Sequence, residues 1–319
     1  MRLIRIGTRG SPLALWQAHH VAQRIAALSA EVAVDIAIIK TRGDEALSAR
    51  RYGTLEKGLF TTEIEDALRA ASIDLAVHSL KDLPTRLADG LTLAAIPVRE
   101  DPADALVAKG NATLESLPPG AMVLSGSLRR RGQLLHRRSD LNVQPARGNV
   151  QTRLRKLDEG PAAATVLACA GLVRSGLENR ISERLDPAVF LPACGQGALA
   201  IETRSDDAAL IEFLSALEHA PTRWAVTAER AMLTALGGGC QIPVGAYARF
   251  EGPSGMMVLT AMACELDGQR LLRETLAAPV SDVASAEALG GKLGQVLTGL
   301  GCGEILARAA AQLKAENGL

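Results

Sequence analysis

Short apolar segments alternate with helical ones along most of this chain, and the alternation occurs twice. In the first round, apolar runs at residues 3–8, 32–41, 73–78 and 91–97 predict strands, with helices that open near Ser11-Pro12 and cover 60–71. The pattern restarts after residues 100–102, with strands expected at 105–108, 122–125, 143–145 and 163–169 and helices at 128–138 and 150–158. Strand–helix–strand units favour mostly parallel sheets flanked by helices, so the sequence predicts two α/β domains.

The last third of the chain has a different character. After residue 220 we expect a helix at 224–236, a glycine turn at 237–240, strands at 257–264 and 269–276 and a helical tail, which together describe a smaller α+β domain. The segment 191–201 is rich in small residues and is interpreted as a crossing back to the first domain. We therefore predict domain 1 at 1–98 and 198–216, domain 2 at 103–193 and domain 3 at 220–319.

Composition excludes several classes of protein. Hydrophobic residues make up 48% and charged residues 22% of the chain, which is typical of a globular protein and not of a disordered one. The 35 Lys and Arg balance the 35 Asp and Glu, so no overall field favours nucleic acid or an anionic membrane. No apolar run reaches the ~20 residues of a membrane span, and the N-terminus lacks the apolar stretch of a signal peptide. The five cysteines have no CxxC spacing, which predicts a cytoplasmic protein with reduced thiols and no metal site.

Basic residues gather in one part of the chain although the net charge is zero. Cations lie beside small residues where three predicted strands lead into helices, and these cations are Arg9, Arg129, Arg130, Arg147 and Arg153. Because helix N-termini bind anions and arginine donates two parallel hydrogen bonds to a carboxylate, the junctions predict a cleft for several anionic groups. A nucleic-acid interface is an alternative. The remaining cations of the region are interpreted as solvated helix faces: Arg131, Arg137, Arg138, Arg155 and Lys156.

Lys81 and Asp82 follow the predicted strand at 73–78 and should lie at the sheet edge that faces this cleft. An aspartate among arginines stays ionised, since nearby positive charge lowers its pKa. It could then stabilise a developing cation or transfer a proton. The alternative is a surface turn with an ion pair, and His78 is interpreted as a packed strand residue.

Three glycines precede Cys240, in a turn that lets a ligand approach closely and exposes the thiol as a nucleophile. The alternative is a hairpin with an inert thiol. The other four cysteines are interpreted as packing residues. A Cys–His hydrolase would need a base that the sequence does not pair with Cys240, and neither a phosphate-binding loop nor an HExxH motif is present. A non-catalytic protein that binds an anionic metabolite is the main competing class.

Eight segments, in order, resemble the porphobilinogen deaminase family, also called hydroxymethylbilane synthases: TRGSPLALWQA (8–18), KGLF (57–60), DLAVHSLKDLP (74–84), SLRRRGQL (127–134), RGNVQTRL (147–154), ACAGLVR (168–174), LPACGQGALAIE (191–202) and GGGCQIPVGAYA (237–248). The resemblance implies two periplasmic-binding-protein-like (type II) α/β domains and a smaller α+β C-terminal domain. It implies a transferase that condenses four porphobilinogen molecules head to tail with loss of ammonia and then releases hydroxymethylbilane by hydrolysis. The growing chain starts on a dipyrromethane cofactor, held covalently by a thioether to Cys240.

The resemblance also assigns roles to individual residues. Asp82 matches the catalytic aspartate, and Lys57 and Phe60 belong to a mobile loop over the cleft. The positions that bind carboxylates of the cofactor and substrate are Arg9, Ser11, Lys81, Ser127, Arg129, Arg130, Arg147, Arg153 and Arg174. Two departures stand out: Ser125-Gly126-Ser127 replaces a common Thr-Ser-Ser, and Arg50 and Arg51 are the nearest cations to a further family lysine. The resemblance implies a cytoplasmic monomer without metal, nucleic acid or membrane partner, whose product passes to uroporphyrinogen-III synthase.

Overall fold

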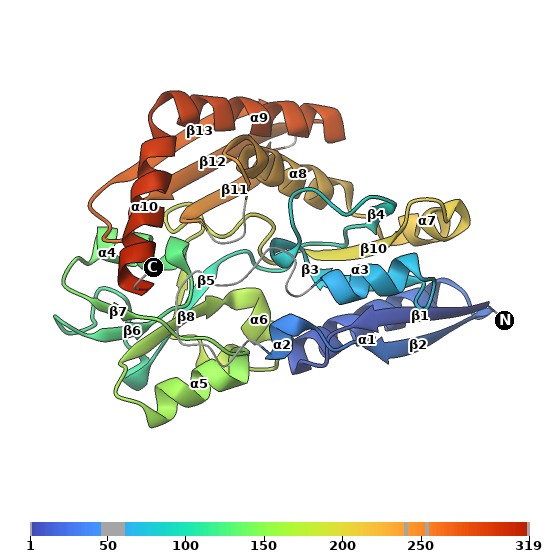
Figure 1. The fold of residues 1–319 in the computed structure, drawn as a ribbon, viewed down its shortest axis with the longest axis horizontal. Coiled ribbons are helices and arrows are strands. Elements are labelled where there is room, and N and C mark those ends of the chain that lie inside the picture. Colours follow the sequence, from blue (N-terminus) through green and yellow to red (C-terminus); the bar gives the residue numbers. More distant parts are fainter. Residues whose placement is uncertain (1, 46–60, 239–241, 253–254, 318–319) are drawn as a thin grey trace.

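Three sheets organise the chain (Figure 1). The computed structural model describes residues 2–45, 61–238, 242–252 and 255–317. The first sheet contains β1 (Arg2–Thr8), β2 (Val32–Ile38), β3 (Leu75–Ser79), β4 (Leu91–Ala95) and β10 (Leu199–Arg204). The helices of this part of the chain are α1 (Pro12–Leu28), α2 (Arg42–Glu45), α3 (Thr62–Arg69) and α7 (Ala208–Leu214).

The second sheet lies on the other side of the molecule in the same view (Figure 1). It contains β5 (Asp104–Ala108), β6 (Met122–Leu124), β7 (Asn142–Gln144), β8 (Ala164–Ala168) and β9 (Glu183–Leu185). Its helices are α4 (Leu128–Arg137), α5 (Val150–Glu159) and α6 (Cys169–Arg174).

The two sheets share one strand order. The first runs β2-β1-β3-β10-β4 and the second β7-β6-β8-β5-β9. In each sheet the fourth strand of this order is antiparallel to both of its neighbours, whereas the first three run parallel to one another. These strands are β10 and β5, and each is the first strand in the sequence after the chain crosses from the other sheet. The prediction of two α/β domains is confirmed, with one reversed strand in each sheet that the alternation of segments did not indicate.

The third part of the chain forms an antiparallel sheet of β11 (Val244–Glu251), β12 (Met256–Cys264) and β13 (Leu271–Pro279). The helices α8 (Ala220–Ala235) and α9 (Val283–Gly299) pack against each other and share an apolar core with the sheet. The helix α10 (Cys302–Asn317) and the second domain's α4 also contact β12. A central strand with neighbours on both faces needs apolar residues throughout, and all but one residue of β12 is buried. The predicted α+β domain is therefore present.

Local sequence explains where several helices begin. The hydroxyl of Ser11 accepts a hydrogen bond from the backbone N of Ala14, and Pro12 occupies the first turn of α1. Asn149 caps α5 in the same way, with its side chain 2.8 Å from the N of Thr152. Several expectations needed correction: the strand predicted at 32–41 ends at residue 38, and α6, α7, β9, β10 and β11 were not predicted. The shortest of these, such as the three-residue β9, have too little periodicity to be distinguished from loops.

Two chain segments, 96–103 and 191–198, connect the α/β domains and run against each other. The N of Glu100 donates to the carbonyl of Gly197, and Arg99 Nε donates to the carbonyl of Gln196 at 2.8 Å. A Cβ at position 197 would lie 2.3 Å from the Glu100 carbonyl oxygen, so only glycine allows this approach. The two crossings therefore form one packed hinge. The predicted domain boundaries fall beside it and stay a prediction.

A buried carboxylate of the third domain holds this hinge. Glu229 of α8 is fully buried, and its oxygens accept from Arg99 Nη1 at 2.7 Å, from Gly195 N at 2.7 Å and from Ala248 N at 3.0 Å. One side chain thus joins both crossings to two elements of the third domain. An unpaired buried charge is strongly destabilising, so arrangements that separate Glu229 from these partners are unfavourable. The contacts therefore restrict how the two α/β domains and the third domain can lie relative to one another.

Candidate active site

The first domain contributes a cavity at the ends of β1 and β3. Arg9, Ser11, Gln17, His78 and Asp82 are among the residues that line it. Lys81 and Asp82 lie in a single 3-10 turn, Leu80–Asp82, that directly follows β3. The side chain of Asp82 is exposed. The placement of these residues at one sheet edge agrees with the sequence analysis.

A buried contact between a histidine and a carboxylate lies at the wall of this cavity, which His78 lines. His78 and Glu202 come from the neighbouring strands β3 and β10, and His78 Nε2 lies 3.0 Å from Glu202 Oε2. Both side chains are buried, at 7% and 0% exposure. The interpretation of His78 as a packed strand residue is confirmed, and Glu202 is a partner that the sequence analysis missed.

The second domain brings its cations to the same place from the starts of α4 and α5. Ser127 accepts from the N of Arg130 and begins α4, while Arg153 Nε donates to the carbonyl of Gly148 at 2.8 Å. Burial and the charge of Arg130 lower the pKa of Arg153 to about 10, and Asp82 opposes this shift. The charges of Arg153 and Asp82 therefore act on each other although they belong to different domains. Burial also lowers the pKa of Arg147, which is partly exposed.

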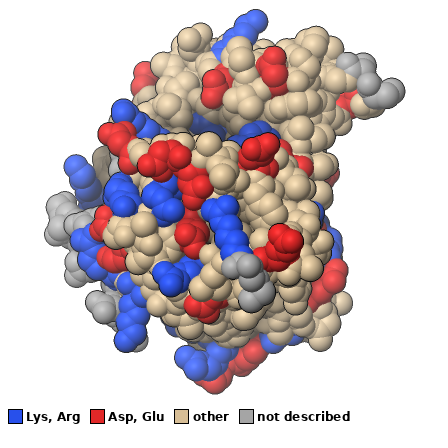
Figure 2. All heavy atoms as spheres, turned by 90° about the vertical axis from the view of Figure 1, so that its right-hand side faces the viewer, with Lys and Arg blue, Asp and Glu red and all other residues tan. Residues whose placement is uncertain are grey.

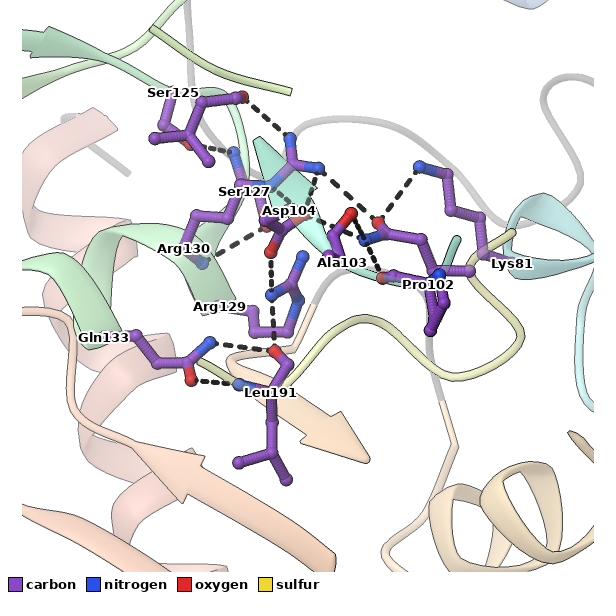
Figure 3. A network of polar contacts seen from close by, with 12 residues as sticks. Lys81, Pro102, Ala103, Asp104, Ser125, Ser127, Arg129, Arg130, Gln133 and Leu191 are labelled. Carbon is purple, nitrogen blue, oxygen red and sulfur yellow. Dashed lines mark hydrogen bonds and ion pairs between the residues drawn. The ribbon is translucent and has the colours of Figure 1, made fainter. Parts of the chain in front are cut away.

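Two arginines of α4 are buried on a carboxylate that the sequence analysis did not find (Figure 3). Asp104, the first residue of β5, accepts from Arg129 Nη1 at 2.6 Å and from Arg130 Nη2 at 2.6 Å. Arg129 also donates to the Leu191 carbonyl, and Arg130 to the Val166 carbonyl. Burial alone would raise the pKa of Asp104, but the two guanidinium groups hold it well below its ordinary range. Asp104 thus stays ionised and fixes both side chains.

The interpretation of the neighbouring cations as solvated was wrong for two of them. Arg131 is 13% exposed and pairs with Glu316 of α10 at 2.7 Å. Arg138 is 14% exposed, pairs with Asp140 and donates to backbone carbonyls at residues 114, 115 and 117. Periodicity could not show this because the covering segments are distant in sequence. On the face of the molecule in Figure 2, Lys and Arg lie among Asp and Glu.

Lys81 lies between the two domains. Its Nζ is 3.3 Å from the side-chain oxygen of Gln196, in the second crossing (Figure 3). Burial lowers the pKa of Lys81 to about 8, with Asp82 opposing this shift and Arg130 adding to it. Desolvation disfavours the charged ammonium form of a lysine, so an anionic partner is needed to keep Lys81 protonated.

Arg174 closes the contact between α6 and the first domain. Its Nη2 donates to the Gly197 carbonyl at 2.7 Å, and its guanidinium lies 5.9 Å from the centre of the Trp16 ring of α1. Burial lowers its pKa to about 10. Arg174 therefore binds the hinge and the first domain at once.

The glycine turn that leads to Cys240 begins against the loop that follows Asp82. α8 ends in a Schellman motif: the N of Gly237 donates to the Thr234 carbonyl and the N of Gly238 to the Leu233 carbonyl, with Gly237 at φ +87°. A Cβ on Gly238 would lie 3.0 Å from the hydroxyl of Thr85, three residues after Asp82. Arg230 of α8 secures the same loop by donating to the carbonyls of residues 83, 84 and 85. Cys240 itself, with Lys57 and Phe60, lies outside the described residues.

The four described cysteines are buried and free of disulfides: Cys169, Cys194, Cys264 and Cys302. Burial raises the pKa of the Cys169 and Cys264 thiols to about 12, which keeps them as unreactive thiols. Their interpretation as packing residues is confirmed. Among the described residues, no group of three His, Cys, Asp or Glu side chains is arranged to hold a metal ion. Within the same ranges, no helix has the length and apolar character needed to cross a bilayer.

Two α/β lobes are joined by two crossings, and cations of both lobes lie near one exposed carboxylate. These features define a two-lobed α/β protein with a cationic site where the lobes meet. Residues 4–212 match the family described as "Porphobilinogen deaminase, dipyromethane cofactor binding domain", and residues 224–299 match "Porphobilinogen deaminase, C-terminal domain". The chain belongs to the porphobilinogen deaminase family. The predicted architecture of two α/β domains followed by a smaller α+β domain is confirmed.

Full-length relatives agree with this family. The chain is 51% identical over 310 residues to a porphobilinogen deaminase of Desulforudis audaxviator, covering 97% of this chain and 99% of that one. It is 48% identical to one of Syntrophotalea carbinolica, covering 95% of both. Among solved structures, it is similar to the substrate binding domain of a putative molybdenum ABC transporter from Clostridium difficile, with a TM-score of 0.42, 10% identity and coverage of 69% and 93%. Similarity at that level says nothing of ligand or activity.

Proposed function

We propose that this chain is a hydroxymethylbilane synthase, a transferase that joins four porphobilinogen molecules head to tail on a dipyrromethane cofactor and releases hydroxymethylbilane by hydrolysis. One observation carries the proposal: Asp82 is an exposed carboxylate on which cations of both lobes act, and the glycine turn that leads to Cys240 approaches the loop that follows it, at Thr85. Each pyrrole unit bears an acetate and a propionate, so the growing chain is a polyanion. A cleft that keeps several cations and one carboxylate suits such a ligand and a cationic intermediate together.

The residues present fit the cofactor. Its acidic side chains need cations and hydroxyl donors, and we assign this role to residues of both lobes: Arg9, Ser11, Lys81, Ser127, Arg129, Arg130, Arg147, Arg153 and Arg174. Burial lowers the pKa values of Lys81 and Arg153 because it disfavours their charged forms. An anionic partner compensates for this loss of hydration. Arg129 and Arg130 already share Asp104, which leaves their role mainly that of orienting the site. When bound, the cofactor supplies the free pyrrole carbon to which the first substrate is joined.

Asp82 performs the chemistry that this chain itself contributes. Loss of ammonia from porphobilinogen leaves positive charge on the substrate pyrrole, and the Asp82 carboxylate stabilises it and exchanges protons with the pyrrole nitrogen. The surrounding arginines and Lys81 hold the acidic side chains of the substrate, so the reacting ring is presented to Asp82 in one orientation.

Cys240 is the attachment point for the cofactor. It is two residues beyond Gly238, so their Cα atoms are at most about 7 Å apart. Gly238 approaches Thr85, in the loop that follows Asp82, and this approach supports the proposal that the cofactor is attached on this side of the cleft. For Lys57 and Phe60 the proposal keeps the role that the family resemblance implies, that of a loop over the cleft. We further propose a cytoplasmic monomer without metal, nucleic-acid or membrane partner that passes its product to uroporphyrinogen-III synthase.

Intact mass spectrometry and a turnover assay test this proposal. Protein purified from a haem-competent host should be heavier than its bare chain by two condensed pyrrole units and should consume porphobilinogen. Cys240→Ala should have the bare mass and no sustained turnover. Cys302→Ala, which removes a buried thiol of the same domain, should keep the added mass. A bare parent chain that consumes no porphobilinogen but releases a ligand on dialysis would instead indicate a binding protein.

A further inference from the structure

Gln196 lies in the second crossing, and its side-chain amide contacts Lys81 of the first lobe and Arg130 of the second. The residue is only 1% exposed. Its Nε2 donates to the carbonyls of Pro102 at 2.8 Å and Ala103 at 3.2 Å and to Asp104 Oδ1 at 2.9 Å. All three partners are acceptors that belong to the first crossing or to the start of β5.

The other end of the same amide meets only donors. The Oε1 atom of Gln196 accepts from Lys81 Nζ at 3.3 Å and from Arg130 Nη2 at 3.5 Å. The nitrogen of the amide faces acceptors and its oxygen faces cationic donors. A flipped amide would lose these hydrogen bonds, so only one orientation is satisfied. Lys81 comes from the first lobe and Arg130 from the second. One neutral side chain therefore joins a cation of each lobe to the hinge.

We propose that Gln196 is a positioning residue: its amide links the ammonium group of Lys81 to the carboxylate of Asp104 and so fixes where the cations of the two lobes meet. The inference rests on the proposed function, because it assigns to Lys81 the binding of an acidic side chain of cofactor or substrate. Gln196 itself acts through Lys81 and Arg130 and need not touch the ligand.

The contact matters because Lys81 has an unfavourable environment for its charge. Two carboxylates, Asp82 and Asp104, favour the ammonium form, whereas Arg129, Arg130 and burial oppose it, and the pKa lies at about 8. The Gln196 oxygen accepts from the ammonium form. Loss of this acceptor shifts Lys81 toward the neutral amine, which cannot bind a carboxylate with a full charge.

The direct test is a titration of Lys81 in the full-length Cys240→Ala chain, which holds no cofactor. Isotope-labelled lysine gives a simple NMR spectrum because the chain has seven lysines, and the Lys81 signal is identified by its absence in Lys81→Arg. A hydrogen bond to a charged group at this long distance is expected to contribute about tenfold, so Gln196→Met should lower the titration midpoint by about one pH unit. A midpoint within about 0.2 pH units of the parent's would overturn the inference.

Two further variants separate positioning from structure. Gln133 is a buried glutamine of α4, 3% exposed, whose amide bonds both backbone groups of Leu191. Gln133→Met should lower thermal stability and leave the Lys81 midpoint unchanged. Gln196→Glu keeps the length and the acceptor, so its midpoint should lie at or above the parent's. A downward shift in Gln196→Glu contradicts the proposal, and this holds even if Gln196→Met fails to fold.

Steady-state kinetics of the cofactor-loaded proteins complete the design. Gln196→Met should raise KM for porphobilinogen by about tenfold at pH 8, with the alkaline limb of kcat/KM moved to lower pH. In Gln133→Met, the alkaline limb of the kcat/KM profile should lie at the same pH as in the parent. An inactive parent refutes the proposed function without affecting the titration, whereas an active parent with an unmoved titration refutes only the role of Gln196.

Discussion

Replacement of Asp104 by Asn tests whether one buried carboxylate holds the two arginines of α4. Asp104 is fully buried, and four donor atoms surround it: Arg129 Nη1, Arg130 Nε and Nη2, and Gln196 Nε2. Asparagine offers one acceptor oxygen and turns an amide donor toward the remaining cation. Two buried guanidinium groups then lack a counter-charge.

The magnitude follows from that loss. Removing one partner of a buried ion pair costs about 3–5 kcal/mol of the free energy of unfolding, because the other charge stays buried without compensation. The effect should also depend on pH in a stated direction. The pKa of Asp104 is lowered in the fold, so its stabilisation is present above the unfolded pKa of about 4 and is lost as pH falls below that value. The difference between parent and variant should therefore shrink in acid.

Urea unfolding of cofactor-loaded parent and variant measures the change, with Asp158→Asn as the control. Asp158 and Arg180 form a surface pair at 2.6 Å with side chains 49% and 33% exposed, and its loss should cost below about 1 kcal/mol. If Asp104→Asn costs no more than this control at pH 7, the claim that Asp104 neutralises the two arginines is refuted.

The remaining predictions concern the reacting carboxylate and the hinge. Asp82→Asn should keep the added cofactor mass but turn over about 10²-fold more slowly or worse, since the amide cannot exchange protons, and near-normal turnover would remove Asp82 from the mechanism. Glu229→Gln should lower the free energy of unfolding by about 3–5 kcal/mol, since it leaves Arg99 buried without a counter-charge. Thermal denaturation should show this at neutral pH, and an unchanged midpoint would mean that Glu229 does not hold the hinge.

Much of the fold was predictable because its signals are local. Ser11 and Ser127 begin helices at the expected junctions, and the strand ends that bear Arg9 and Asp82 lie where the alternation placed them. The reversed strand β10 was not predictable in this way. Its position between β3 and β4 depends on pairing partners about 120 and 110 residues away. The apolar residues of a buried strand do not indicate whether the strand runs parallel or antiparallel to its neighbours.

The site was predictable in its cations and not in what holds them. The arginines form a visible cluster, whereas Asp104 is one acid at the start of a short apolar run and its partners lie 25 and 26 residues further along the chain. Gln196 gives no signal, because a lone glutamine among small residues has no periodicity. From the sequence, these arginines were expected to face an anionic ligand, so no protein carboxylate was sought to balance their charge.

The insertion of β10 has a consequence for how the protein is made. Among the strands of the described ranges, β4 pairs only with β10, so the polypeptide reaches residue 95 before its partner at 199–204 exists. At about 5–20 residues per second, a ribosome takes roughly 5–20 s to supply that partner. During this interval the edge of β3 and both edges of β4 are unpaired, the condition in which nascent chains associate with one another. The N-terminal lobe can mature only after the whole second lobe has emerged, and we expect chains truncated before residue 199 to bind chaperones or aggregate.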